Sequence, residues 1–219
     1  MAIIGAVKKV FPGAQIIGCL FHLYQNWRKQ LRKLLMLDRV DNELNLDRDW
    51  RSLKALAYTP TQEVVAAYEV LIRSPDFDRE FWAPFLGYLE VHYIGQYRFG
   101  IRGDGQFKRA MWNVYDRTIE NGMRTNNSVE GFHMRINTFF EVTHPTLWKF
   151  IARLRKFEEI VYKELRSWEN GQLPPKRKLW ERVNHNKKIA CDKFTDVVNG
   201  QMTRLDYLKL IGRTLVKPT

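Results

Sequence analysis

Apolar residues recur at helical spacing along most of the chain, and one short run departs from that pattern. The run at 15–21 is rich in apolar residues and predicts a buried strand. Helical spacing precedes this run at 2–10 and resumes after it at 21–35. The first part of the chain therefore predicts a helix, a strand and a second helix in that order.

Beyond this part the pattern predicts one helix after another. Residues 37–91 keep helical spacing and are interrupted at Pro60 and near Pro75. The glycine-rich residues 93–107 predict turns and loop, and 112–115 predict a short extended piece. We therefore expect a mainly α fold with a little β structure.

A helix predicted to begin near Asn127 places one carboxylate beside an apolar stripe. Asn127 is a favourable N-cap residue, and Glu130 three positions later gives the spacing of a capping box. Glu130 also shares a polar ridge with His133 and Asn137. The apolar stripe beside this ridge consists of Val129, Phe132, Ile136, Phe139 and Phe140. The residues alone favour a capping role for Glu130 and a packed role for His133.

A second long amphipathic helix is predicted at 147–168. Its apolar residues recur at helical spacing, and basic residues gather on the opposite face. These basic residues are Lys149, Arg153, Lys156 and Lys163. Such a face fits either a solvated surface or a site for an anionic partner.

The net charge of the chain is strongly positive. The chain has 36 Lys+Arg against 24 Asp+Glu, which leaves a formal net charge of +12. This excess attracts polyanions without selecting a sequence, so nucleic acid and a merely solvated basic surface are equally good explanations of the charge. No apolar run approaches the roughly 18 residues of a membrane span, and no secretory signal opens the chain. We expect an intracellular protein without a membrane partner.

Two cysteines are too few for a disulfide scaffold and fit a reducing compartment. Cys19 and His22 form a Cys-x-x-His pair at the predicted strand-to-helix junction. A thiolate and an imidazole at this spacing could share a zinc ion, but a closed zinc site needs two further ligands. A packed cysteine and a junction histidine are the favoured interpretation.

Two segments resemble one protein family. Residues 1–14 followed by 18–26, and residues 125–133 followed by 144–151, resemble the Mutator-like element (MULE) transposase domain. The first pair of segments matches the part of that family just after its second catalytic aspartate, and the second pair matches the part with its last acidic residue. The resemblance covers roughly residues 1–168.

The resemblance implies a partial RNase H-like core of the DDE type interrupted by an all-helical insertion. It divides the chain into 1–36 as distal core, 37–120 as insertion and 121–170 as a return to the core. The residue pattern beyond the resemblance predicts a basic linker and helical tail at 171–219.

The same resemblance implies roles for particular residues. Glu130 matches the third catalytic carboxylate, a ligand of Mg²⁺ or Mn²⁺ in the intact protein, and Cys19 and His22 match the family's Cys/His motif. The residues expected to contact DNA are Arg124, Asn126, Asn127, Lys149, Arg153, Lys156 and Lys163.

The chain departs from the family pattern at its catalytic centre. The two aspartates of the family would lie before Met1, so Glu130 is the one carboxylate of the three that is present. We therefore expect a nuclear fragment of a DNA transposase that binds no metal tightly and is inactive alone, with DNA as partner and a second copy as a possible one. The alternative is a domesticated, non-catalytic DNA-binding or transcription-regulatory protein derived from a transposase.

Overall fold

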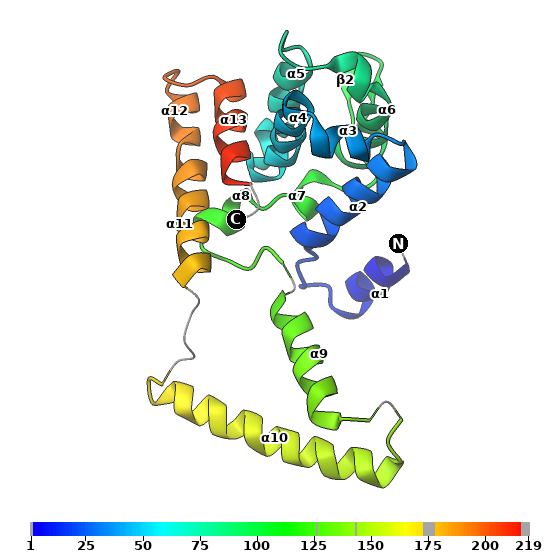
Figure 1. The fold of residues 1–219 in the computed structure, drawn as a ribbon, viewed down its shortest axis with the longest axis vertical. Coiled ribbons are helices and arrows are strands. Elements are labelled where there is room, and N and C mark those ends of the chain that lie inside the picture. The colour runs from blue at the N-terminus through cyan, green and yellow to red at the C-terminus, as the bar shows by residue number, and fades with distance from the viewer. Residues whose placement is uncertain (1, 126, 143, 173–177, 216–219) are drawn as a thin grey trace. The chain divides into compact units, whose positions relative to one another are not determined.

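The computed structural model describes the chain except for residues 1, 126, 143, 173–177 and 216–219 (Figure 1). It is mainly helical, which confirms the predicted mainly α class. The chain forms two compact units, one comprising Met1–Arg124 and Val183–Thr219 and the other Thr125–Arg182. Each unit is described by itself. The sequence-based boundaries after 36, 120 and 170 stay predictions.

The first unit is built from short helices. Along the chain these are α1 (Ala2–Val10), α2 (Leu20–Lys33), α3 (Leu37–Asn42), α4 (Leu44–Ala55), α5 (Val64–Ile72), α6 (Arg79–Leu89), α7 (Arg109–Trp112), α8 (Tyr115–Ile119), α12 (Phe194–Val198), α13 (Arg204–Thr214) and, from Val183 onward, most of α11 (Lys178–Asp192). Two 3₁₀ turns, η1 (Leu56–Tyr58) and η2 (Thr61–Glu63), join α4 to α5, and a π-helical turn, η3 (Glu90–Ile94), follows α6. The helical block predicted for 37–91 is confirmed.

Aromatic side chains fill the centre of the first unit. Trp27 of α2 is fully buried, and its ring centroid lies 6.1 Å from that of Trp50, 6.2 Å from that of Phe85 and 5.6 Å from that of Tyr93. These rings come from α2, α4, α6 and η3, so one indole joins four segments of the chain. Such tilted and edge-to-face pairs add to the stability gained by burying the rings.

The C-terminal helices return to the same unit. α13 packs along α4, and a Cβ added at Gly212 would lie 3.2 Å from the Cβ of Arg51, so the two helices approach closely. The Tyr207 hydroxyl donates a 2.6 Å hydrogen bond to the Tyr58 carbonyl. Burial raises the pKa of the neighbouring Cys191 thiol to about 12, so this cysteine is an inert core residue.

Lys54 of α4 is a partly buried cation. Its ammonium lies 5.4 Å from the centroid of the Trp50 ring and 5.9 Å from that of Tyr24, and within the described part of the chain no carboxylate is bonded to it. The pKa of Lys54 is lowered to about 8, chiefly by burial; the nearby Asp47 carboxylate opposes this shift, and the cations Arg51 and Arg28 add to it. The folded state therefore bears the cost of a poorly solvated charge at neutral pH.

Lys54→Met is expected to raise the free energy of unfolding at pH 7, and this gain should shrink by about 3 kcal/mol by pH 10.5. Between the folded pKa of about 8 and the unfolded value of 10.5 the unfolded state binds more protons, so the Lys54 contribution grows more favourable as pH rises. Urea denaturation of both proteins at several pH values measures the difference. Lys29→Met, on an exposed part of α2, is the control. A gain that does not vary with pH contradicts the assignment.

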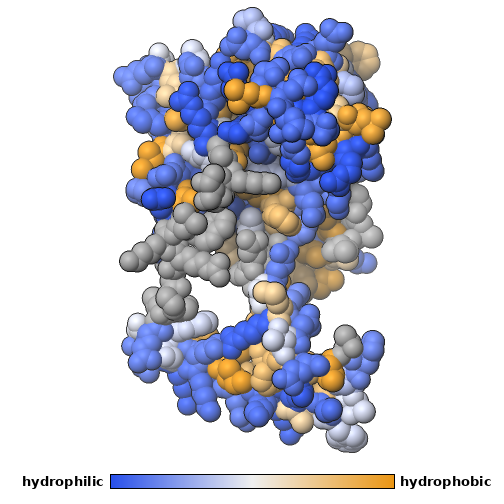
Figure 2. All heavy atoms as spheres, in the orientation of Figure 1, coloured by the Kyte–Doolittle hydropathy of each residue, from blue (hydrophilic) through white to orange (hydrophobic). Residues whose placement is uncertain are grey.

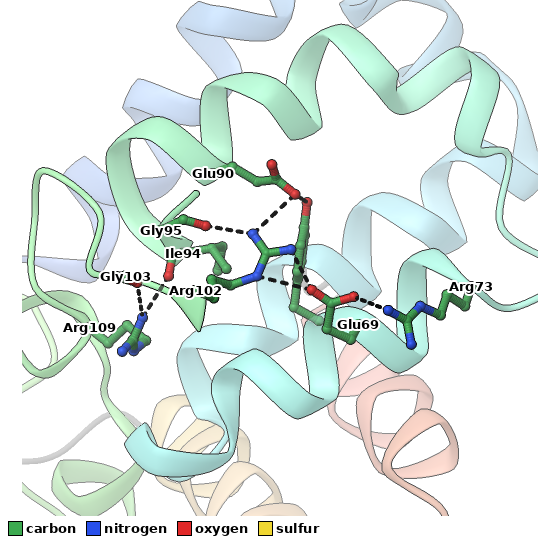
Figure 3. Close-up of polar contacts among 9 residues, drawn as sticks. Glu69, Arg73, Glu90, Ile94, Gly95, Arg102, Gly103 and Arg109 are labelled. Atoms are coloured by element: carbon green, nitrogen blue, oxygen red, sulfur yellow. Dashed lines mark hydrogen bonds and ion pairs between the residues drawn. The ribbon is translucent and has the colours of Figure 1, made fainter. Parts of the chain in front are cut away.

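A buried arginine fixes the loop after α6. β1 (Tyr97–Arg98) and β2 (Ile101–Arg102) form an antiparallel hairpin whose two turn residues both have positive φ. Figure 3 shows the Arg102 guanidinium between Glu69 and Glu90 and donating to the Gly95 carbonyl at 2.5 Å. The Arg102 side chain is only 5% exposed, so these acceptors replace its water. The cluster ties the hairpin to α5 and η3.

Two extended elements expected from the sequence do not form. Residues 14–19 have no regular secondary structure, and Ile17 is 44% exposed, so the strand predicted at 15–21 is wrong. A strand needs a neighbour with which to pair. Here the contacts are two isolated hydrogen bonds, from Gly18 N–H to the Met111 carbonyl at 2.6 Å and from Leu20 N–H to the Arg124 carbonyl at 2.9 Å.

The extended piece predicted at 112–115 does not form either, because its first and last residues are helical. α7 ends at Trp112 and α8 begins at Tyr115, which leaves Asn113 and Val114 between them, and only Asn113 has an extended backbone. The Asn113 side chain explains the break, because its oxygen accepts from Tyr115 N–H at 2.8 Å and its amide donates to the Thr59 carbonyl at 2.6 Å. This asparagine turns the chain and starts α8.

The second unit contains α9 (Asn127–Phe140) and α10 (Leu147–Glu169). The prediction of a long helix at 147–168 is confirmed. Phe139 and Phe140 of α9 meet Phe157 and Phe150 of α10, with ring centroids 5.3 Å apart in both pairs. These contacts join the two helices near the end of α9.

Candidate functional site

Glu130 lies in the first turn of α9 and is exposed. The helix begins at Asn127 itself, so the predicted cap residue lies inside the helix and Glu130 is its fourth residue. Asn126 lies outside the described residues, and the Asn127 side chain is not described. A carboxylate in a first turn is favoured by the helix dipole whatever else it does.

The apolar stripe of α9 packs over only part of its length. Phe140 is buried and Phe139 is partly buried, whereas Val129 is 49% exposed and Phe132 is 45% exposed. The turn with Glu130 is therefore not packed against a core within this unit, contrary to the expectation from the stripe. Figure 2 shows apolar residues beside hydrophilic ones on the visible surface around α10.

An ion pair joins the middle of α9 to α10. The Arg135 guanidinium donates two hydrogen bonds of 2.7 Å to the Glu164 carboxylate and lies 5.5 Å from the centroid of the Phe157 ring. The hydrogen bonds from Arg135 lower the pKa of Glu164. Bidentate geometry of this kind fixes the angle between two helices more than a single ion pair does.

Arg153 has a structural role, and the DNA contact expected for it stays a prediction. Its guanidinium donates to the carbonyls of Phe139, at 2.9 Å, and of Phe140, and it pairs with Glu141 at 3.3 Å. The last carbonyls of a helix have no partner within the helix, and a cation there also meets the negative end of the dipole. Arg153 therefore caps the C-terminus of α9.

Arg153→Ala is expected to lower the free energy of unfolding of the second unit by about 1–2 kcal/mol, because two carbonyls lose a charged donor. Hydrogen exchange in α9 and urea denaturation measure this loss. Lys156→Ala is the matched control on the same helix, and it should leave stability within about 0.5 kcal/mol. Equal stability of the two variants would show that the cap contributes nothing.

The other three cations of the basic face remain available. Lys149, Lys156 and Lys163 are exposed, and within the described residues the structure gives their ammonium groups no hydrogen bond or ion pair. They recur every seven residues, which places them about 10 Å apart along one side of α10. Trp148 is 79% exposed and Tyr162 is 58% exposed, and each immediately precedes one of these lysines in the sequence of α10. Exposed rings next to cations suit nucleic acid, which offers bases to stack and phosphates to neutralise.

The remaining predicted residues lie in the first unit. Arg124 donates to the Asn184 side chain, and its carbonyl accepts from Leu20 N–H. Cys19 precedes α2 and is partly buried, whereas His22 is exposed within the first turn, with its ring centroid 5.4 Å from that of Phe21. In the described residues no group of three His, Cys, Asp or Glu side chains is placed to hold a metal ion.

Of these residues, the family resemblance assigns Glu130 alone to a metal centre. A pair of divalent cations in such a centre requires several converging carboxylates, and Glu130 supplies one. Glu130 belongs to the second unit, and Cys19 and His22 belong to the first. What the second unit offers chemically is a cationic surface with exposed aromatic rings, which can bind an anion without a metal.

Comparison with protein-family models, with curated proteins and with solved structures finds no match to this chain. No helix among the described residues is long and apolar enough to cross a membrane.

Proposed function

We propose that the chain derives from a MULE-type DDE transposase and that its own contribution is to bind DNA through α10. The observation that supports this proposal best is the row of Lys149, Lys156 and Lys163, exposed at regular intervals beside Trp148 and Tyr162. Cations in such a row neutralise successive phosphates and release the counterions held by DNA.

Strand cleavage is not proposed for the chain by itself. The ancestral reaction, metal-dependent DNA transposition in the nucleus with Mg²⁺ or Mn²⁺, requires carboxylates besides Glu130. In this proposal Glu130 belongs to the catalytic centre of a longer protein, and the lysines of α10 hold the DNA there. Incubating the chain with supercoiled plasmid and either metal should leave the plasmid intact.

DNA binding is tested by titrating labelled duplex DNA with the chain at increasing salt. We expect the logarithm of the affinity to fall linearly with the logarithm of the salt concentration and to depend little on sequence. Absence of binding at about 50 mM salt would refute the proposal.

The second candidate is a domesticated, non-catalytic DNA-binding or regulatory protein. Both candidates bind DNA through α10, and they differ in whether the exposed Glu130 carboxylate takes part in catalysis. A longer protein that includes the upstream coding sequence separates the two candidates. Cleavage that Glu130→Gln abolishes favours the transposase, because glutamine keeps an acceptor for capping but removes the charge. No cleavage by the longer protein favours the regulator.

A further inference from the structure

A hollow in the first unit lies between α4 and α13, with the turn after α5 as its third wall. Its volume is about 480 Å³, within the range of roughly 300–1,000 Å³ that is typical of small-molecule sites. The close approach of α13 to α4 at Gly212 forms one side of it. Figure 1 shows these two helices side by side.

Cations dominate the charged lining of this pocket. The charged and polar side chains that line it are those of Asn45, Arg48, Asp49, Arg51, Ser52, Ser74, Asp76, Lys209 and Arg213. Four of these side chains are basic and two are carboxylic acids, so the lining has a surplus of positive charge.

Most of the charges are already satisfied. Arg51 pairs with Asp47, and the Lys209 ammonium lies 3.3 Å from the Asp76 carboxylate. The buried Asp49 carboxylate accepts from the Trp82 indole N–H at 3.1 Å and from the Asp78 N–H at 3.3 Å. The charges of these paired residues are therefore compensated within the protein and do not select a ligand.

Two guanidinium groups are left with free donors. Among the described residues, Arg213 makes no hydrogen bond or ion pair that the structure records, and Arg48 makes one long contact of 3.4 Å to the Leu44 carbonyl. Both side chains are exposed at the mouth of the same pocket. A planar guanidinium with unfilled donors matches the oxygens of a phosphate, which it binds through two parallel hydrogen bonds.

Apolar side chains form the rest of the wall. Leu71, Phe77 and Leu205 line the pocket, so a ligand with a ring system could bury it there while its anionic group meets the arginines. We propose that this pocket binds an organic phosphate of mononucleotide size. The site lies wholly in the first unit and does not depend on the α10 surface.

Calorimetric titration of the whole chain with AMP, adenosine and inorganic phosphate tests the proposal. AMP should bind at least about tenfold more tightly than either of the others, because it alone supplies both the phosphate and the ring. Absence of binding at millimolar AMP, or equal affinity for AMP and either of the others, would overturn it.

A double variant with Arg48→Gln and Arg213→Gln tests the assigned residues. We expect its affinity for AMP to fall by about 10- to 100-fold with an unchanged melting temperature, because both side chains are exposed. The matched control is Arg79→Gln, an exposed arginine of α6 outside the pocket, and it should bind AMP like the wild type. An unchanged affinity in the double variant would refute the assignment.

The phosphate could belong to a free nucleotide or to the end of a DNA strand. One short oligonucleotide with a 5′-phosphate and the same strand with a 5′-hydroxyl distinguish these sources, because any contribution of α10 is equal for both. If the wild type binds the phosphorylated strand more tightly and the double variant does not, the ligand of the pocket is the end of a DNA strand. Equal binding of the two strands, together with binding of AMP, identifies a free nucleotide.

Discussion

Trp27→Ala should lower the free energy of unfolding of the first unit by about 3–5 kcal/mol. Trp27 is fully buried and contacts rings from α4, α6 and η3, so its loss leaves a large cavity where several helices meet. Domains have only about 5–15 kcal/mol of stability, and this variant should therefore be close to unfolding at 37 °C.

Urea denaturation followed by circular dichroism at 222 nm measures that loss. Trp148→Ala removes the same side chain from a position that is 79% exposed, and it should change stability by less than about 1 kcal/mol. Equal effects of the two substitutions would mean that the aromatic cluster is not the centre of the unit.

The long helices could be predicted from the sequence because their signal is local. The apolar residues from Leu147 onward keep helical spacing for six turns, and α10 ends at Glu169, one residue beyond the expected end. The strand at 15–21 failed because a strand is defined by its neighbour. Composition alone does not show whether that neighbour exists.

The candidate site could be predicted only in part. The sequence places Lys149, Lys156 and Lys163 on one face of a helix, and the structure has all three exposed. The sequence did not reveal the capping role of Arg153, because the carbonyls that Arg153 caps belong to another helix. No sequence pattern predicted that Arg48 and Arg213 line one pocket, because the two residues lie far apart in the chain.

The triple variant with Lys149→Ala, Lys156→Ala and Lys163→Ala should reduce DNA affinity by about 10²- to 10³-fold at 50 mM salt. Each lysine that contacts a phosphate contributes through counterion release, and this contribution is largest at low salt. None of the three makes a hydrogen bond or ion pair within the described residues, so we expect the variant to keep the stability of the wild type.

The matched control removes the same charge elsewhere. Lys8, Lys9 and Lys108 are exposed lysines of the first unit, and their replacement by alanine also lowers the net charge by three. A general attraction between a basic protein and DNA would weaken equally in both triple variants. If α10 contacts the DNA, affinity should fall strongly only in the variant that lacks Lys149, Lys156 and Lys163.

The slope of log affinity against log salt concentration, measured for the wild type and both triple variants, tests the α10 surface most directly. Loss of three phosphate contacts should flatten the slope by about 2–3 units in the α10 variant and by less than about 1 unit in the control. Equal slopes for the wild type and the α10 variant would contradict the proposal that this helix binds DNA.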